Sequence, residues 1–95
     1  MKILLLEDNI DKREKIANAV LEIMPGADIH FVMNWYDYSC KIVSAQFDLI
    51  LLDIMVPRSA KDPRVEDHHS QLVETTRSFE SRSFRTPAIV LTEYL

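Results

Sequence analysis

Four short runs of hydrophobic residues predict four β-strands along this chain. The runs cover residues 2–6, 27–33, 47–54 and 88–91. The first and third are hydrophobic without alternation, which is typical of strands buried on both faces of a parallel sheet. The second carries hydrophobic side chains at alternate positions, which favours a strand with one buried face. We expect Pro57 to close the third strand, and the fourth run to be another buried strand.

The segment between the first two runs has hydrophobic residues at helical spacing. Within residues 11–24, the hydrophobic residues at positions 16, 17, 20, 21 and 24 form one face of a helix. Asn9 or Asp11 can cap its start. Pro25-Gly26 ends it, and Gly26 is the only glycine in the chain.

Residues 34–46 give an ambiguous pattern that allows a short helix with Asp37 as its cap. Trp35, Tyr36 and Tyr38 form an aromatic cluster near its start. We expect these rings to contribute to the core or to cover it, because large aromatic side chains bury much apolar surface.

Hydrophobic residues become sparse after the third run. Asp62-Pro63 is typical of a helix cap followed by proline at the first helical position. We therefore expect a loop over residues 58–62 and an exposed helix over residues 63–82. We interpret His68-His69 as part of the polar surface of this helix, because their spacing matches no zinc motif.

Strands that alternate with helices predict an α/β fold with a doubly wound parallel sheet. We expect residues 1–95 to form a single domain, since domains most often contain about 100–150 residues. In such sheets the functional crevice lies beyond the C-terminal ends of the strands. The residues at those ends are therefore the first candidates for function.

Composition excludes several classes of protein. Hydrophobic residues make up 47% of the chain and charged residues 27%, which excludes a disordered tail, a fibre and a disulfide scaffold. The net charge of -4 does not favour nucleic acid as a partner. The one cysteine, Cys40, cannot form an internal disulfide, and we expect it to be small, buried and reduced. No run approaches the length of a membrane span, so we expect a soluble, cytoplasmic protein with no membrane partner.

Acidic residues directly follow or end two of the predicted strands. Glu7 and Asp8 come after the first strand, and Asp53 lies near the end of the third. Parallel strands end at one edge of a sheet, so these carboxylates are expected to meet. Grouped carboxylates repel, and one takes up a proton unless a cation neutralises them. Mg²⁺, which prefers oxygen ligands, is the expected cation, and the alternative is a set of unrelated solvated acids.

Asp53 also has a chemical option. A carboxylate can attack phosphorus and form an acyl phosphate, while a metal neutralises charge on the transferred oxygens. Thr92 follows the fourth predicted strand, where its hydroxyl can bond one of those oxygens. Taken alone, Thr92 is better explained as an ordinary residue at a strand end.

Three motifs in this order resemble the receiver domain of bacterial two-component response regulators. They are Leu-Leu-Leu-Glu-Asp-Asn at residues 4–9, Phe-Asp-Leu-Ile-Leu-Leu-Asp-Ile-Met-Val-Pro at 47–57, and Pro-Ala-Ile-Val-Leu-Thr at 87–92. The resemblance covers essentially the whole chain and is weak over residues 58–85. It implies a flavodoxin-like sheet with strand order 2-1-3-4.

The resemblance also implies roles for individual residues. Asp53 would be the phosphoacceptor, and Thr92 the hydroxyl that reports the phosphoryl group. Glu7 and Asp8 would hold Mg²⁺ together with Asp53, with Asp8 the more direct ligand. The backbone carbonyl of Met55 would complete the metal site. The implied function is a phosphorelay signalling domain, not an enzyme, whose partner is a histidine kinase or a phosphotransfer protein.

The chain departs from the receiver pattern after Thr92. Receivers continue with a fifth strand that carries a lysine and with a last helix, which this sequence lacks. Lys61 lies in a predicted loop with no reason to reach the site, and Glu93 replaces the small residue usual after the threonine. A receiver-like interaction module that is not phosphorylated is therefore the alternative function. A phosphatase is disfavoured because Met55 stands where its second acid would be.

Without a fifth strand, the strand at residues 88–91 becomes an edge of the sheet. An apolar edge with unpaired backbone groups invites pairing with another chain. The sequence therefore predicts that the chain forms a homodimer or swaps elements with another copy through this edge.

Overall fold

Four parallel strands form one sheet in the computed structural model, which describes residues 1–91. They are β1 (Lys2–Leu6), β2 (Asp28–Val32), β3 (Leu49–Asp53) and β6 (Ala88–Leu91). The strands lie side by side in the order β2-β1-β3-β6, and all pairs are parallel. This confirms the predicted α/β class with a parallel sheet, and the arrangement is compatible with a flavodoxin-like fold.

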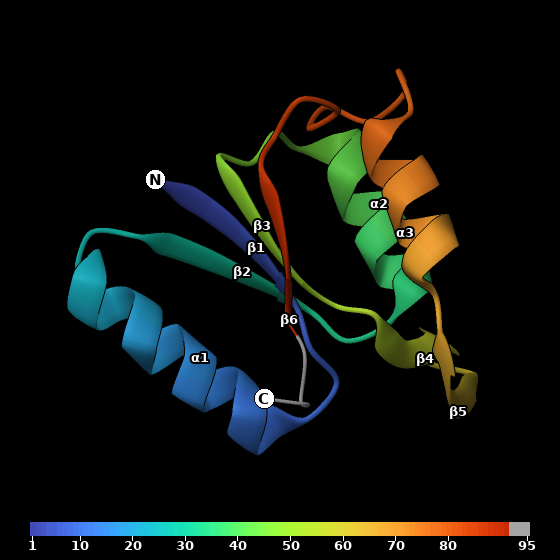
Figure 1. Ribbon diagram of the computed structural model, residues 1–95, viewed down its shortest axis with the longest axis horizontal. Coiled ribbons are helices and arrows are strands. Elements are labelled where there is room, and N and C mark those ends of the chain that lie inside the picture. The colour runs from blue at the N-terminus through green and yellow to red at the C-terminus, as the bar shows by residue number, and fades with distance from the viewer. Residues whose placement is uncertain (92–95) are drawn as a thin grey trace.

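Helices cover both faces of the sheet (Figure 1). Helix α1 (Ile10–Ile23) lies on one face, and α2 (Trp35–Ser44) and α3 (His69–Arg77) lie together on the other. Connections through helices on both faces are what a doubly wound sheet requires. None of the helices in residues 1–91 combines the length and the apolar character needed to cross a bilayer.

Asparagine residues cap the first two helices. Asn9 Oδ1 accepts a hydrogen bond of 3.0 Å from the backbone of Lys12, so Asn9 rather than Asp11 is the cap of α1. Asn34 Oδ1 accepts one of 2.8 Å from the backbone of Asp37. The expected Asp37 cap was therefore wrong, and α2 begins at Trp35 because Asn34 satisfies its first free N–H groups.

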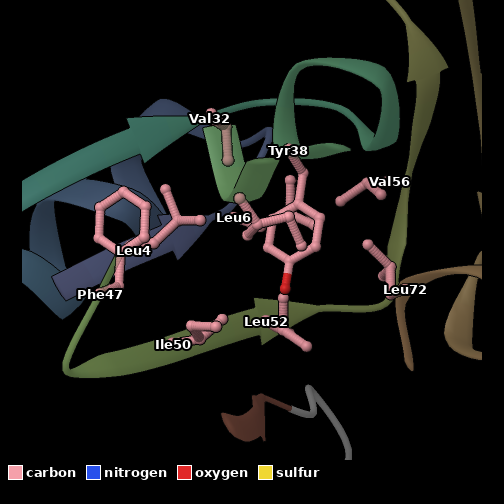
Figure 2. Packing of buried hydrophobic residues seen from close by; sticks show 10 residues of the cluster. Leu4, Leu6, Val32, Tyr38, Phe47, Ile50, Leu52, Val56 and Leu72 are labelled. Atoms are coloured by element: carbon pink, nitrogen blue, oxygen red, sulfur yellow. The ribbon is translucent and has the colours of Figure 1, made fainter. Parts of the chain in front are cut away.

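The sheet divides the hydrophobic core into two layers, and Figure 2 shows the larger of them. Leu4 and Leu6 of β1 point toward α2 and α3, whereas Ile3 and Leu5 point toward α1. This alternation follows from the two-residue period of a strand, and it explains why the run is hydrophobic without a break. The larger layer contains Leu4, Leu6, Val32, Tyr38, Ile42, Phe47, Ile50, Leu52, Val56 and Leu72.

A β-hairpin replaces the predicted loop over 58–62 and the first part of the predicted helix over 63–82. Strands β4 (Met55–Ser59) and β5 (Asp62–Asp67) pair antiparallel, and α3 begins only at His69. Both predictions for this segment were therefore wrong. The buried Val56 side chain attaches the hairpin to the core, while nearly all of β5 is exposed.

Local turn chemistry explains why the prediction failed. The Asp62 carboxylate accepts a hydrogen bond of 3.0 Å from Nε of Arg64, so it stabilises the start of β5 and caps no helix. Aspartate and proline favour turns as well as helix starts. A two-stranded sheet also tolerates Pro57 and Pro63, since each strand has an edge that needs no donor. Pro57 thus lies within β4 and does not close the third strand.

Several side chains differ from expectation in their exposure. Cys40 is exposed on α2, whose inward face is formed by Tyr38 and Ile42, so its expected burial was wrong. His68 is only 4% exposed and stacks on Trp35 with ring centroids 6.1 Å apart. Its expected place on a polar surface was therefore also wrong.

The aromatic cluster behaves as expected in part. Tyr38 is fully buried and Trp35 is half-buried against the core, whereas Tyr36 is exposed. The hydroxyl groups of Tyr38 and Thr76 are hydrogen-bonded to each other, which joins α2 to α3. The aromatic residues of α2 therefore serve mainly to attach this helix to its neighbours.

Strand β6 is a half-exposed edge. Within residues 1–91 it pairs only with β3, and Ile89 and Val90 remain 52% and 38% exposed. The expectation of a buried fourth strand was wrong. The expectation of an unpaired edge agrees with the described part of the chain, which leaves the predicted dimer a matter for experiment.

Candidate functional site

Three carboxylates meet at the C-terminal edge of the sheet. β1 ends just before Glu7 and Asp8, and β3 ends at Asp53. Because β1 and β3 are neighbours in the sheet, one carboxylate oxygen from each residue lies within 4.8 Å of the others. The structure therefore brings together the three acids selected from the sequence.

The cluster is largely shielded from solvent. Glu7 is 1% exposed and Asp53 is 5% exposed, while Asp8 is half-buried. Burial raises the pKa of Glu7 from 4.5 to about 7, opposed by the Asn9 backbone N–H and assisted by the nearby Asp53 carboxylate. At neutral pH the Glu7 carboxyl group therefore holds its proton far more often than an exposed glutamate does.

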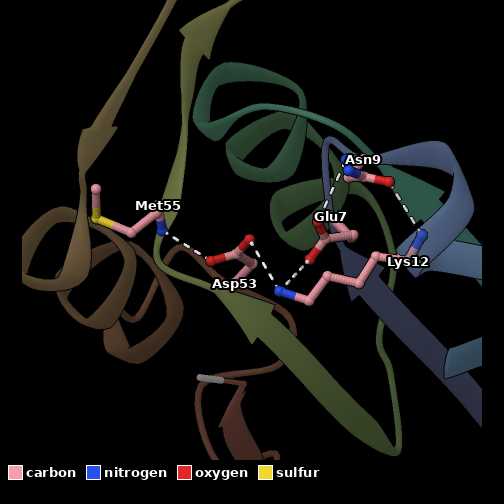
Figure 3. Close-up of polar contacts among 5 residues, drawn as sticks. All are labelled: Glu7, Asn9, Lys12, Asp53 and Met55. Atoms are coloured by element: carbon pink, nitrogen blue, oxygen red, sulfur yellow. Dashed lines mark hydrogen bonds and ion pairs between the residues drawn. The ribbon is translucent and has the colours of Figure 1, made fainter. Parts of the chain in front are cut away.

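Lys12 lies between the acids, although sequence reasoning did not select it. Its Nζ is 3.6 Å from Glu7 Oε2 and 3.8 Å from Asp53 Oδ2 (Figure 3). The sequence carried a signal, because Lys12 falls in the first turn of α1, where the helix dipole disfavours a positive charge. A lysine in this place needs nearby acids to explain it.

The turn between β1 and α1 holds these groups in register. The backbone N–H of Asn9 donates to Glu7 Oε1 at 3.2 Å, while Asn9 Oδ1 accepts a hydrogen bond from the backbone N–H of Lys12. Glu7, Asn9 and Lys12 therefore form a closed set of contacts (Figure 3). The cap of a helix and the orientation of a site carboxylate depend on the same residue.

The segment after β3 orients Asp53. The backbone N–H of Met55 donates to Asp53 Oδ1 at 3.0 Å, which leaves Oδ2 facing Lys12. The Met55 carbonyl, proposed from the sequence as a metal ligand, stays a prediction. The next residue after Asp53, Ile54, accepts a hydrogen bond of 2.9 Å from the backbone of His68, so the site is connected to the start of α3.

Thr92 and Glu93 lie outside the described residues, and the role expected for Thr92 stays a prediction. The register of the sheet pairs Asp53 with Leu91, the last residue of β6. Lys61 lies in the turn between β4 and β5 and is exposed, as expected for a residue with no place at the site.

The donor set suits a hard divalent cation. All three side chains offer carboxylate oxygens, which are the ligands that Mg²⁺ prefers. Glu7 Oε2 is buried and has no hydrogen-bond partner, so an oxygen with free lone pairs faces the cluster. These residues could therefore hold Mg²⁺.

A pocket of about 840 Å³ opens beside the cluster, between α2 and the β4–β5 hairpin. Asp8, Arg13, Lys41, Pro57 and Pro63 are among the residues that line it. Asp8 is thus reachable from solvent, which is what a group exchanging a hydrated ion or meeting a phosphodonor requires.

A distant similarity to a curated protein agrees with this geometry. The chain is 27% identical over 99 residues to the Detocs response regulatory protein DtcB of Enterobacter cloacae (strain JD6301). The match covers 99% of this chain, which spans 66% of the length of that protein. No family model and no solved structure matches the chain. The fold, the acidic cluster and this similarity together indicate a domain that resembles the receiver of a response regulator.

Proposed function

We propose that this chain is a receiver-like signalling domain that accepts a phosphoryl group on Asp53 with the help of Mg²⁺. The observation that carries the proposal is the meeting of Glu7, Asp8 and Asp53 within 4.8 Å at the C-terminal edge of the sheet. The similarity to a response regulatory protein supports the same function. We propose that the domain turns over no substrate and is not an enzyme. Its proposed setting is the cytoplasm, where a histidine kinase or a phosphotransfer protein would donate the phosphoryl group.

Asp8 and Asp53 are the proposed direct ligands of Mg²⁺, with the Met55 carbonyl as a third. Glu7 contributes through its charge, because it is the most deeply buried of the three acids. Bound Mg²⁺ would neutralise charge on the oxygens of the transferred phosphoryl group. Asp8 lies in the wall of the open pocket, so a hydrated Mg²⁺ ion could reach this carboxylate from solvent.

The proposed transfer forms one bond and breaks one. An Asp53 carboxylate oxygen attacks the phosphorus of a phosphohistidine, and the phosphorus–nitrogen bond of the donor breaks. The bonding electron pair stays on the imidazole nitrogen, which takes up a proton. Because the Met55 backbone N–H donates to Oδ1, we propose that Oδ2 is the oxygen that attacks the phosphorus atom.

The phosphoryl group would act as a switch through its charge. It adds nearly two negative charges to a site that already contains three acids. Groups that contact the site, such as the Met55 backbone and the start of α3, would then shift between two arrangements. The proposed role of Thr92 is to bond the phosphoryl oxygen from the end of β6.

The test uses Trp35, the only tryptophan, as a reporter. Trp35 stacks on His68, whose backbone bonds to Ile54 beside Asp53, so a change at Asp53 should reach the indole. Beryllofluoride, which mimics a phosphoryl group, should cause a saturable change in fluorescence that requires Mg²⁺. Asp53→Asn should abolish the change, whereas Asp48→Asn, at the start of the same strand region, should preserve it.

A receiver-like interaction module that takes no phosphate is the second candidate. It is favoured by Lys12, which already supplies a positive charge to the acids without any metal. The absence of any response to beryllofluoride at millimolar Mg²⁺ would support this candidate over the first.

A further inference from the structure

Lys12 contacts the same carboxylate oxygens that a metal and a phosphoryl group would use. Its Nζ lies 3.6 Å from the otherwise unbonded Oε2 of Glu7 and 3.8 Å from Oδ2 of Asp53. The side chain is 26% exposed, so the ammonium group lies at the margin of the buried cluster and keeps access to water. The charge is therefore held at the site, within reach of solvent.

Helix stability does not explain this lysine. Lys12 occupies the third residue of α1, where the N-terminal partial charge of the helix repels a cation. Its backbone is fixed by the cap from Asn9, so the position of the stem is set while the four-carbon side chain can rotate. The interactions that favour a lysine here are the contacts of its ammonium group with Glu7 and Asp53.

Mg²⁺ bound to Asp8 and Asp53 would compete with the Lys12 ammonium group for the Asp53 carboxylate, which Lys12 contacts at Oδ2. Two cations at the same carboxylate repel each other, and the divalent ion is the stronger competitor for it. When the metal binds, Nζ must move off the acids. The nearest new anion in the proposed function is the phosphoryl group that Asp53 would carry, and Asp53 Oδ2 lies 3.8 Å from Nζ before any movement.

We propose that Lys12 exchanges partners, bonding the site carboxylates in the metal-free protein and the phosphoryl group after Asp53 is modified. This inference rests on the proposed function, and it adds a residue that binds the phosphoryl group. Lys12 thereby lowers the affinity for Mg²⁺ alone and raises the affinity for the phosphoryl group once Mg²⁺ is bound.

The first arm of the test measures Mg²⁺ binding by isothermal titration calorimetry without any phosphoryl mimic. Lys12→Gln removes the competing charge, so its affinity for Mg²⁺ should rise by about threefold or more. Lys15→Gln is the matched control, because it removes the same charge from an exposed position of the same helix. Its Mg²⁺ affinity should equal that of the unaltered protein.

The second arm measures beryllofluoride binding at saturating Mg²⁺. Lys12→Gln loses a charge-assisted bond to the mimic, so its affinity should fall by about tenfold or more. Lys12→Arg keeps the charge and should retain most of the affinity. Opposite changes in the two arms identify a partner exchange, since a merely structural defect would weaken both.

Each outcome decides the proposal. If the unaltered protein binds beryllofluoride and Lys12→Gln binds it equally well, Lys12 does not hold the phosphoryl group and only this inference is wrong. A parallel loss in both arms likewise rejects the exchange. If the unaltered protein binds neither Mg²⁺ nor beryllofluoride, the proposed function is wrong, and the inference is wrong with it.

Discussion

The carboxyl group of Glu7 is the least exposed part of the acidic cluster, and its ionisation is therefore sensitive to its neighbours. Burial raises its pKa to about 7, whereas an unfolded chain leaves it near 4.5. The folded state thus binds this proton more tightly than the unfolded state. A group of this kind contributes its full stabilisation at pH values below about 4.5, and the contribution is lost as the pH rises through 7.

Without metal, the free energy of unfolding is therefore expected to contain a term that falls between pH 4.5 and 7. At about 1.4 kcal/mol for each pH unit between the two pKa values, the fall amounts to about 3 kcal/mol. Urea unfolding at a series of pH values in a chelator measures it. Glu7→Gln should remove this term, while Glu14→Gln, an exposed acid of α1, should keep it. Identical profiles for all three proteins would contradict the prediction.

His68 is a second buried polar residue, and the cost of its burial is open to measurement. Neither ring nitrogen has a hydrogen-bond partner within the described residues, although the ring stacks on Trp35. His68→Phe keeps an aromatic ring for stacking and removes the unsatisfied atoms, so stability should rise by about 1 kcal/mol. Urea unfolding at pH 7 checks this, with the exposed His69→Phe as control. A loss of stability in His68→Phe would show that the imidazole has a polar partner.

At the scale of elements, capping residues decide where the helices begin. Asn34 is 4% exposed, and it both caps α2 and donates from Nδ2 to the Asp37 carboxylate at 2.9 Å. Asn34→Ala should cost about 1 kcal/mol in the free energy of unfolding, as measured with urea. Asn34→Ser restores a capping oxygen and should recover most of the loss. Equal losses in the two variants would show that packing around the side chain, and not the cap, is what matters.

The hairpin is the element on which local reasoning was wrong. Asp62-Pro63 is equally compatible with a helix start and a turn, and the pairing of β5 with β4 decided between them. The sparse hydrophobic residues of the predicted helix over residues 63–82 were also misleading, since α3 covers only His69–Arg77, with Leu72 and Thr76 buried, and Phe79 is 90% exposed. A thin stripe of hydrophobic residues does not specify where a helix begins.

At the scale of the whole molecule, the β6 edge of the described residues is the surface through which we propose that copies of the chain pair. Ile89 is 52% exposed on a strand whose other edge pairs with β3. We expect a dimer at high protein concentration, formed by strand pairing through this edge. Light scattering should give twice the mass of one chain, and Ile89→Lys should return it to one. Val73→Lys, on exposed α3 surface, is the control. A single-chain mass at every concentration would reject the dimer.

The sequence by itself determined the α/β class, the strands of the sheet and the meeting of Glu7, Asp8 and Asp53. These features depend on short hydrophobic runs and on the rule that parallel strands end at one edge of a sheet. Both can be recognised from short stretches of sequence. Only the tertiary structure decided the hairpin, the burial of His68 and the reach of Lys12 into the acidic cluster. Each of these depends on contacts between segments far apart in the chain or on the direction of one flexible side chain, which no local pattern of residues specifies.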